Sequence, residues 1–176
     1  VGSEMCIRDS NRSTFERELK SEIERSAHSK VAVLFIDVDD FKFINDRFGH
    51  SVGDEVIKYV AGCIKQRVQG SGFAGRFGGD EFVLCITDPK QIEEIESLSL
   101  DLIDELYEGY HSELANVSIN VKASIGIAFY PEHGDDSNKV VAAADEAMYF
   151  VKKNGKANYH IYQPEDSEME DLQHTL

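Results

Sequence analysis

Long apolar runs are absent from this sequence of 176 residues. The longest uninterrupted run, residues 31–36, has six apolar residues, whereas a membrane-spanning helix needs about 20. Nothing in the chain resembles a secretory signal either. We therefore expect no membrane contact from this segment. We also expect a cytoplasmic location, either on its own or as the cytoplasmic part of a larger membrane-bound protein.

Basic residues are also scarce. Lys and Arg number 18 against 33 Asp and Glu, which gives a formal net charge of −15. This balance argues against general nucleic-acid binding, because such binding depends on a basic face. An acidic body can still bind a nucleotide where a metal ion and local lysines screen the phosphates. Residues 164–176 hold five acids and no Lys or Arg, and we expect this tail to be disordered.

Cysteines are few and form no Cys-x-x-Cys pair. Cys6, Cys63 and Cys85 are odd in number, and the latter two lie in apolar patterns. We interpret these two as buried free thiols of a protein in a reducing compartment.

The length predicts one domain with a proper core. Residues 1–10 show no periodicity that continues into the rest of the chain, and we interpret them as a non-native leader. The domain is expected over residues 11–163, followed by the acidic tail at 164–176. The sequence contains no internal repeat.

Apolar residues at helical spacing predict four helices. Their expected starts are, in order, the capping box Ser13-x-x-Glu16, the pair Gly53-Asp54, Pro89 and the capping residue Ser137. The first helix is expected to end near residue 27. Residues 39–49 are predicted to form a mixed polar turn region, anchored by Phe41, Ile44 and Phe48.

β-Prone runs predict strands at residues 31–36, on both sides of residues 78–81, at 117–129 and at 159–162. Residues 107–116 are predicted to be an irregular link, and Gly126 marks a kink or a close approach of another backbone. The order is α-β-α-β-β-α-β-α-β. Its β-α-β-β-α-β core is the split ferredoxin-like pattern, an α+β fold with a mostly antiparallel sheet and helices packed on it.

Gly78, Gly79, Asp80 and Glu81 lie between the two strands of an expected hairpin. The glycines are expected to adopt the φ > 0 conformations that a tight turn requires. Turn chemistry does not explain two adjacent carboxylates, which repel each other unless a cation lies nearby. A second acidic cluster, residues 37–40, follows the first strand. In the expected fold both clusters share one sheet edge, where they could hold Mg²⁺.

These segments resemble the signature motifs of the GGDEF family of diguanylate cyclases. Residues 78–82 read Gly-Gly-Asp-Glu-Phe, the motif that names the family, and residues 37–54 resemble its other long signature. Residues 123–128 resemble its late strand, and residues 144–155 resemble its last helix. The resemblance covers roughly residues 11–162, and several spaced motifs in agreement are specific where one short motif would be weak.

The resemblance implies a fold of the nucleotide-cyclase and polymerase-palm type. It also implies an enzyme that condenses two GTP into cyclic di-GMP with loss of two pyrophosphates. Two copies of the domain would face each other as a transient homodimer, each with one GTP. The family's Mg²⁺ ligands, which can also hold Mn²⁺, correspond to the carboxylates of Asp37 and Asp80 and the carbonyl of Val38, with Glu81 nearby. Either Asp80 or Glu81 would be the base for the 3′-hydroxyl.

The resemblance also implies contacts to the phosphates of GTP. The backbone N–H groups of Asp40, Phe41 and Lys42 would form an anion-binding nest. Lys152 corresponds to the family's γ-phosphate lysine. The family usually continues with Arg-Asn after its last glycine, where this chain has Lys156-Ala157. A lysine keeps the charge and loses the bidentate fork, so we expect GTP binding to be weakened and not lost.

Base recognition is implied at two further positions. Asn45 and Asp54 match the residues that read guanine, although Asp54 could also cap its helix. A bidentate carboxylate contact to a base is worth about 1–3 kcal/mol against the wrong base. Gly78 and Gly79 would let the backbone approach the nucleotide closely.

Two departures from the family pattern carry predictions. Many members have an Arg-x-x-Asp product-inhibition site before the hairpin, where this chain has Gln69 and Gly72. Neither residue can chelate phosphates through a guanidinium, so no feedback inhibition is expected there. The family's usual lead-in from a sensor domain is also missing, which predicts a fragment that lacks its N-terminal sensor.

The enzyme is weighed against two alternatives. The chain could be a catalytically weak GGDEF-fold module that binds GTP or a regulatory partner, or an interaction domain whose acids have no role. All five hairpin motif residues are present, and Asp37, Asn45, Asp54 and Asp80 all match the family pattern, which favours the enzyme.

Overall fold

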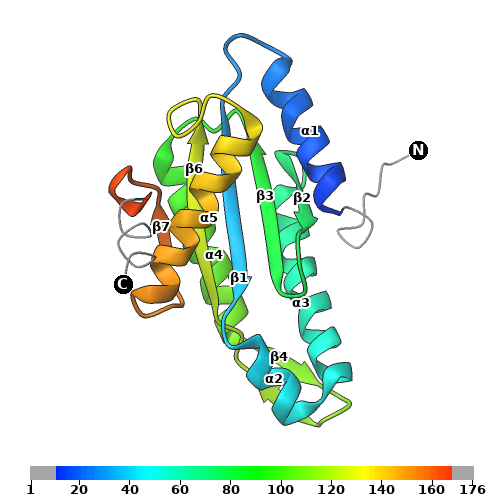
Figure 1. Ribbon diagram of the computed structural model, residues 1–176. Helices are drawn as coiled ribbons and strands as arrows, with labels where there is room; N and C mark the ends of the chain where they lie inside the picture. Colours follow the sequence, from blue (N-terminus) through cyan, green and yellow to red (C-terminus); the bar gives the residue numbers. More distant parts are fainter. Residues whose placement is uncertain (1–10, 168–176) are drawn as a thin grey trace, which may run out of the picture.

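A five-stranded sheet forms the centre of the computed structural model, which describes residues 11–167 (Figure 1). The strands lie in the order β2-β3-β1-β6-β7. Their bounds are Val31–Val38 for β1, Gly72–Arg76 for β2, Glu81–Thr87 for β3, Ala123–Tyr130 for β6 and Tyr159–Ile161 for β7. β1 pairs antiparallel with β3 and β6, and only β7 runs parallel to its neighbour. The predicted ferredoxin-like α+β fold with a mostly antiparallel sheet is therefore confirmed.

Helices cover both faces of the sheet. Their bounds are Arg12–Glu24 for α1, His50–Val68 for α3, Ile92–Glu108 for α4 and Ser137–Lys153 for α5. Even-numbered residues of β1 from Ala32 to Val38 pack in a core with α3 and α4, whereas Val31, Val33 and Phe35 pack with α1 and α5. Because neither face of β1 meets water, its sequence is continuously apolar and does not alternate.

The segment predicted as a polar turn at residues 39–49 is instead a helix, α2, at Phe41–Phe48. It is short and buries only Ile44 fully, which explains why its apolar pattern was weak. Gly49, at φ 91°, separates α2 from α3, and α3 begins at His50 and not at Gly53. Asp54 therefore lies inside α3 and is not its cap.

Two predicted caps are wrong by one or two residues. The side chain of Asn11, and not that of Ser13, accepts a hydrogen bond from the first turn of α1. At α5 the capping residue is Asp136, whose carboxylate accepts from the amide of Lys139. Asp and Asn compete well with Ser for this position because their side-chain oxygens reach the same amides. α1 also ends earlier than predicted, at Glu24, and α4 begins three residues after Pro89.

The region before β6 contains a small hairpin that the sequence did not indicate. β4, Tyr110–Ser112, pairs with β5, Val117–Ile119, in a separate two-stranded sheet. The predicted irregular link at 107–116 thus holds a strand, and the predicted strand at 117–129 is two strands. Three-residue strands are too short to show an alternating pattern.

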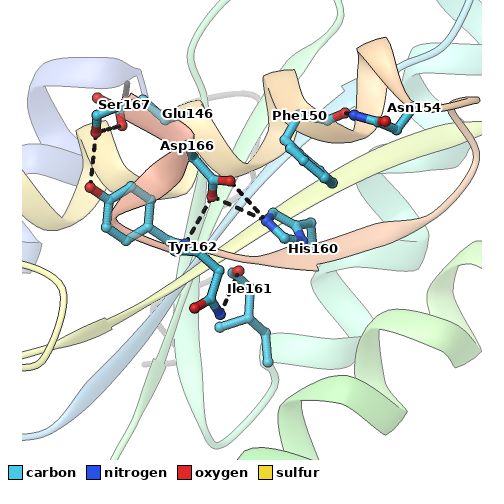
Figure 2. Close-up of polar contacts among 9 residues, drawn as sticks. Glu146, Phe150, Asn154, His160, Ile161, Tyr162, Asp166 and Ser167 are labelled. Atoms are coloured by element: carbon cyan, nitrogen blue, oxygen red, sulfur yellow. Dashed lines mark hydrogen bonds and ion pairs between the residues drawn. The ribbon is translucent and has the colours of Figure 1, made fainter. Parts of the chain in front are cut away.

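Polar side chains join the last strand to residues 163–167 (Figure 2). The Asp166 carboxylate accepts from the amide of Gln163 at 2.8 Å and lies 3.1 Å from Nε2 of His160. Ser167 donates to Glu146 on α5 at 2.6 Å and lies 3.0 Å from the Tyr162 hydroxyl. Residues 166 and 167 of the expected tail are thus tied to β7 and α5, and residues 168–176 lie outside the described part.

Cys63 and Cys85 are buried and free, as the sequence predicts. Burial raises the pKa of the Cys63 thiol to about 11, so it is a neutral packing residue. Cys6 and the whole of the predicted leader, residues 1–10, lie outside the described residues. Among residues 11–167, no helix is both long and apolar enough to cross a bilayer.

Candidate functional site

The two acidic clusters meet at one end of the central strands, as predicted. Asp37 pairs in antiparallel register with Glu81, the first residue of β3. The amide of Val38 donates to the carbonyl of Asp80 at 3.0 Å. The hairpin between β2 and β3 thus lies against the end of β1, and three carboxylates are gathered there from two segments distant in sequence.

The hairpin turn is built differently from the prediction. Gly78 and Gly79 are not among the glycines at positive φ. The guanidinium of Arg76 instead donates to the carbonyls of Gly78 at 3.0 Å and Gly79 at 2.5 Å, which holds the turn in place. A Cβ on Gly79 would meet no atom within 4 Å. Folding therefore does not require glycine at position 79, and the space beside it is open.

Asp37 carries the clearest electrostatic signal of the site. Burial raises the pKa of the Asp37 carboxyl to about 7, and the Lys152 ammonium opposes this rise. The neighbouring carboxyl of Asp80, through its charge and a hydrogen bond to Asp37, and that of Glu81 raise the pKa further. Its Oδ1 atom is buried and has no hydrogen-bond partner among the described residues. A buried acceptor left unpaired beside further carboxylates is an arrangement that a hard cation would stabilise.

The carboxylates alone do not make a complete metal centre. No group of three or more His, Cys, Asp or Glu side chains within residues 11–167 is arranged to hold a metal ion. Mg²⁺ usually takes one or two carboxylates and completes its shell with water and substrate phosphates. The donor set here fits such a partial site.

Lys152, on the last turn of α5, reaches Asp37 and its neighbour Asp39. Its ammonium lies 2.5 Å from Oδ1 of Asp39 and 3.5 Å from Oδ1 of Asp37. Asp39 was not predicted as a site residue, although it belongs to the acidic cluster. Odd-numbered residues of β1 face α1 and α5. Continued past the end of the strand, this alternation indicates that Asp39 also faces α5, the helix that carries Lys152, and it is the signal by which Asp39 could have been found.

The predicted phosphate cradle lies at the start of α2. Asp40 adopts a left-handed conformation, φ 54°, and its carbonyl accepts from the amides of Phe43 and Ile44. The amides of Phe41 and Lys42 belong to the first turn, where a helix has no internal acceptors for them. Lys156 pairs with the Asp40 carboxylate at 2.8 Å, and this hydrogen bond holds the pKa of Asp40 below its usual value.

The two predicted guanine-reading residues lie at the junction of α2 and α3. Asn45 is half-buried on α2, and Asp54 is exposed on α3. The Asn45 side chain lies directly against the backbone of Gly53, because a Cβ on Gly53 would come within 1.8 Å of Asn45 Oδ1. Gly53, the residue before Asp54, therefore makes the room that the Asn45 side chain occupies. Ile44, predicted to be an anchor, and Phe82 are both buried in the core.

Comparisons with known proteins point to one family. The family model described as "Diguanylate cyclase, GGDEF domain" matches residues 10–158. The signaling protein YkoW of Bacillus subtilis is 34% identical over 140 residues, which are 79% of this chain and 17% of YkoW. The diguanylate cyclase DosC of Escherichia coli is 32% identical over 165 residues, which are 92% of this chain and 35% of DosC. The chain thus spans well under half the length of these relatives.

The relatives also include a protein named for a different activity. The cyclic di-GMP phosphodiesterase PdeR of Escherichia coli is 30% identical over 155 residues, 88% of this chain and 23% of PdeR. Among solved structures, the GGDEF domain of YfiN (TpbB) from Pseudomonas aeruginosa matches with a TM-score of 0.87 and 30% identity. That match covers 92% of this chain and 95% of the solved domain.

Proposed function

The chain belongs to the GGDEF family of diguanylate cyclase domains, and on that basis we propose that it condenses two GTP molecules into cyclic di-GMP and two pyrophosphates. The observation that carries the proposal is the meeting of Asp37 with Asp80 and Glu81, where a buried oxygen of Asp37 accepts no hydrogen bond and has only the Lys152 ammonium 3.5 Å away. A merely solvated acidic turn would leave such an oxygen in water.

The ligands proposed for Mg²⁺, or Mn²⁺ in its place, are the carboxylates of Asp37 and Asp80 and the carbonyl of Val38, with Glu81 beside them. When bound, such an ion would supply positive charge that offsets the charge growing on the attacking and leaving oxygens. Either Asp80 or Glu81 takes the proton from the 3′-hydroxyl.

GTP is proposed to lie across the β1–α2 junction. The amides of Asp40, Phe41 and Lys42 would donate to its phosphates, and Lys152 and Lys156 would pair with them. The Asn45 amide could donate to and accept from the guanine edge, and the Asp54 carboxylate would accept from the N–H groups of that edge. The open side of Gly79, with Gly78, lets the nucleotide approach the hairpin backbone.

The bond changes require two copies of the domain. In each transfer an O3′–Pα bond forms, the Pα–O bond to the β-phosphate breaks, and pyrophosphate leaves. A single site holds one GTP, so each 3′-hydroxyl must attack the α-phosphate of the GTP held by the other copy. A transient homodimer is the partner that the reaction needs.

A catalytically weak GTP-binding or regulatory module is the second candidate. Two observations favour it: Lys156-Ala157 replaces the family's usual Arg-Asn, and one similar relative is named for phosphodiesterase activity. The intact Gly-Gly-Asp-Glu-Phe motif favours the enzyme over this module.

Turnover at increasing protein concentration separates the two candidates. Incubation with GTP and Mg²⁺ is expected to release pyrophosphate and yield cyclic di-GMP, with no comparable product from ATP. Because two half-sites must meet, the rate per protein molecule should rise with protein concentration at low protein. GTP binding without any pyrophosphate release over that range would favour the module.

Product inhibition is expected to be absent at the position where many relatives have it. Gly72 has no room for the family's aspartate, because a Cβ there would come within 1.8 Å of the Cys85 carbonyl oxygen on β3. Gln69, at the end of α3, supplies no guanidinium. Initial rates measured with added cyclic di-GMP should therefore show no non-competitive inhibition, which is inhibition that persists in excess GTP. Inhibition of that kind at low micromolar product would contradict the expectation.

A further inference from the structure

Asp39 is the most completely enclosed charged side chain near the site. It lies between two proposed contact residues, Val38 and Asp40, and its side chain has no exposed surface. Burying a carboxylate costs much free energy unless it is paired and hydrogen-bonded. The partners of Asp39 therefore indicate what this buried charge does.

Both oxygens of the Asp39 carboxylate are engaged by protein donors. Oδ1 accepts from the hydroxyl of Ser124 on β6 at 2.7 Å and from the ammonium of Lys152 at 2.5 Å. Oδ2 accepts from the amide of Ala157 at 2.9 Å. A carboxylate enclosed and occupied in this way is not available to a metal ion, which distinguishes Asp39 from the partly exposed Asp37 two residues earlier.

The turn that Asp39 holds through Ala157 is strained. Gly155, Lys156 and Ala157 follow one another at φ 105°, 61° and 48°. Left-handed conformations at two successive non-glycine residues persist only where the surroundings fix them. Asp39 supplies one of these fixing contacts, because it binds the amide of Ala157, the residue directly after Lys156.

We propose that Asp39 is a positioning residue for the triphosphate: it holds the ammonium of Lys152 and the turn that carries Lys156 at the edge of the phosphate cradle. The inference rests on the proposed GTP site and deepens it. Lys152 is otherwise drawn towards Asp37, 3.5 Å away. Asp39 fixes the Lys152 ammonium between the carboxylates of Asp37 and Asp39. From this position Lys152 can contact the phosphates while the buried Asp39 carboxylate stays paired.

The test compares binding of GTP with binding of GMP, which lacks the β- and γ-phosphates. Asp39→Asn keeps the size of the side chain and removes the charge. Because charge-assisted hydrogen bonds are the strong ones, we expect its GTP dissociation constant to rise by about tenfold, with that of GMP unchanged. Titration calorimetry with Mg²⁺ present and a non-hydrolysable GTP analogue measures both constants without turnover.

A double-mutant cycle distinguishes positioning from general support of the fold. Lys152→Ala should weaken GTP binding by itself, and adding Asp39→Asn to it should weaken binding by less than Asp39→Asn does in the wild type, because part of the effect of Asp39 passes through Lys152. Additive effects, or equal losses for GTP and GMP, would overturn the inference. If Asp39→Asn does not fold, Ser124→Ala, which removes only the hydroxyl donor to Oδ1, should give a smaller loss for GTP alone.

The outcomes also separate this inference from the proposed activity. Wild-type protein that binds GTP and makes no cyclic di-GMP would refute the cyclase and leave the role of Asp39 standing. If the wild-type protein makes cyclic di-GMP and the Asp39→Asn variant binds GTP as tightly as wild type, the role of Asp39 is refuted and the cyclase stands. If the wild-type protein binds neither nucleotide, both fall.

Discussion

Asp80→Asn is expected to lower GTP turnover by about a thousandfold while leaving the fold intact. Loss of a single charge-stabilising group in an active site typically costs about 10²–10³-fold in rate. A carboxylate that is also proposed to hold the metal and that borders the second acid lies at the upper end of that range. The change removes one negative charge from a cluster in which Asp80 and Glu81 already raise the pKa of Asp37. Folding stability should therefore be unchanged or slightly higher.

Asp88→Asn is the matched control for this variant. Asp88 follows β3 at the end opposite to the hairpin, where it is exposed and pairs with Lys90. It adopts φ 50°, a conformation that asparagine tolerates as well as aspartate. Pyrophosphate release should be at the wild-type rate for Asp88→Asn, and thermal unfolding should be similar for both variants. An Asp80→Asn variant with near wild-type turnover would mean that the metal assignment is wrong.

The sheet and the meeting of the acidic clusters could be predicted because both follow from chain order. A continuously apolar strand at 31–36 must be buried on both faces, and a hairpin at 78–81 in a β-α-β-β-α-β order must lie beside its end. The structure adds the register, which pairs Asp37 with Glu81. These features depend on patterns of several residues and therefore survive small local errors.

The errors concern features set by one or two contacts. α2 went unrecognised because it is eight residues long and buries one residue fully. The hairpin glycines were assigned to φ > 0, whereas Arg76 closes that turn by binding two carbonyls. Asp39 was passed over because its partners, Lys152 and Ala157, lie more than 100 residues later in the chain. The alternation along β1 indicates that Asp39 faces α5, but no local signal identifies which distant residues pair with it.

Gly126→Ala is expected to destabilise the fold strongly, although it adds only one methyl group. Gly126 lies in the middle of β6, opposite Phe35 of β1, and its strand is continuous. Of the two predicted reasons for this glycine, the close approach is therefore correct and the kink is not. A Cβ would come within 2.0 Å of the Ala144 carbonyl oxygen and 2.1 Å of the Met148 amide nitrogen on α5.

Both obstacles at Gly126 are backbone atoms, so no side chain can turn aside and α5 must shift as a unit. Overpacking a core costs about 1–3 kcal/mol and occasionally more, and this site should reach or exceed the upper value. For a chain of this size that corresponds to a fall of about 6–12 °C in the melting temperature. Because α5 carries Lys152, GTP binding should weaken even where the variant remains folded.

Gly62→Ala tests whether the loss of stability in Gly126→Ala comes from the steric clash with α5 and not from replacing a glycine as such. Gly62 is exposed on α3, and a Cβ there meets no atom within 4 Å. Alanine in a helix interior is favoured over glycine by about 0.5–1 kcal/mol, so this variant should melt slightly higher than the wild type. Calorimetric unfolding of the two variants should thus move in opposite directions. A Gly126→Ala protein that melts with the wild type would show that β6 and α5 are further apart than the structure has them.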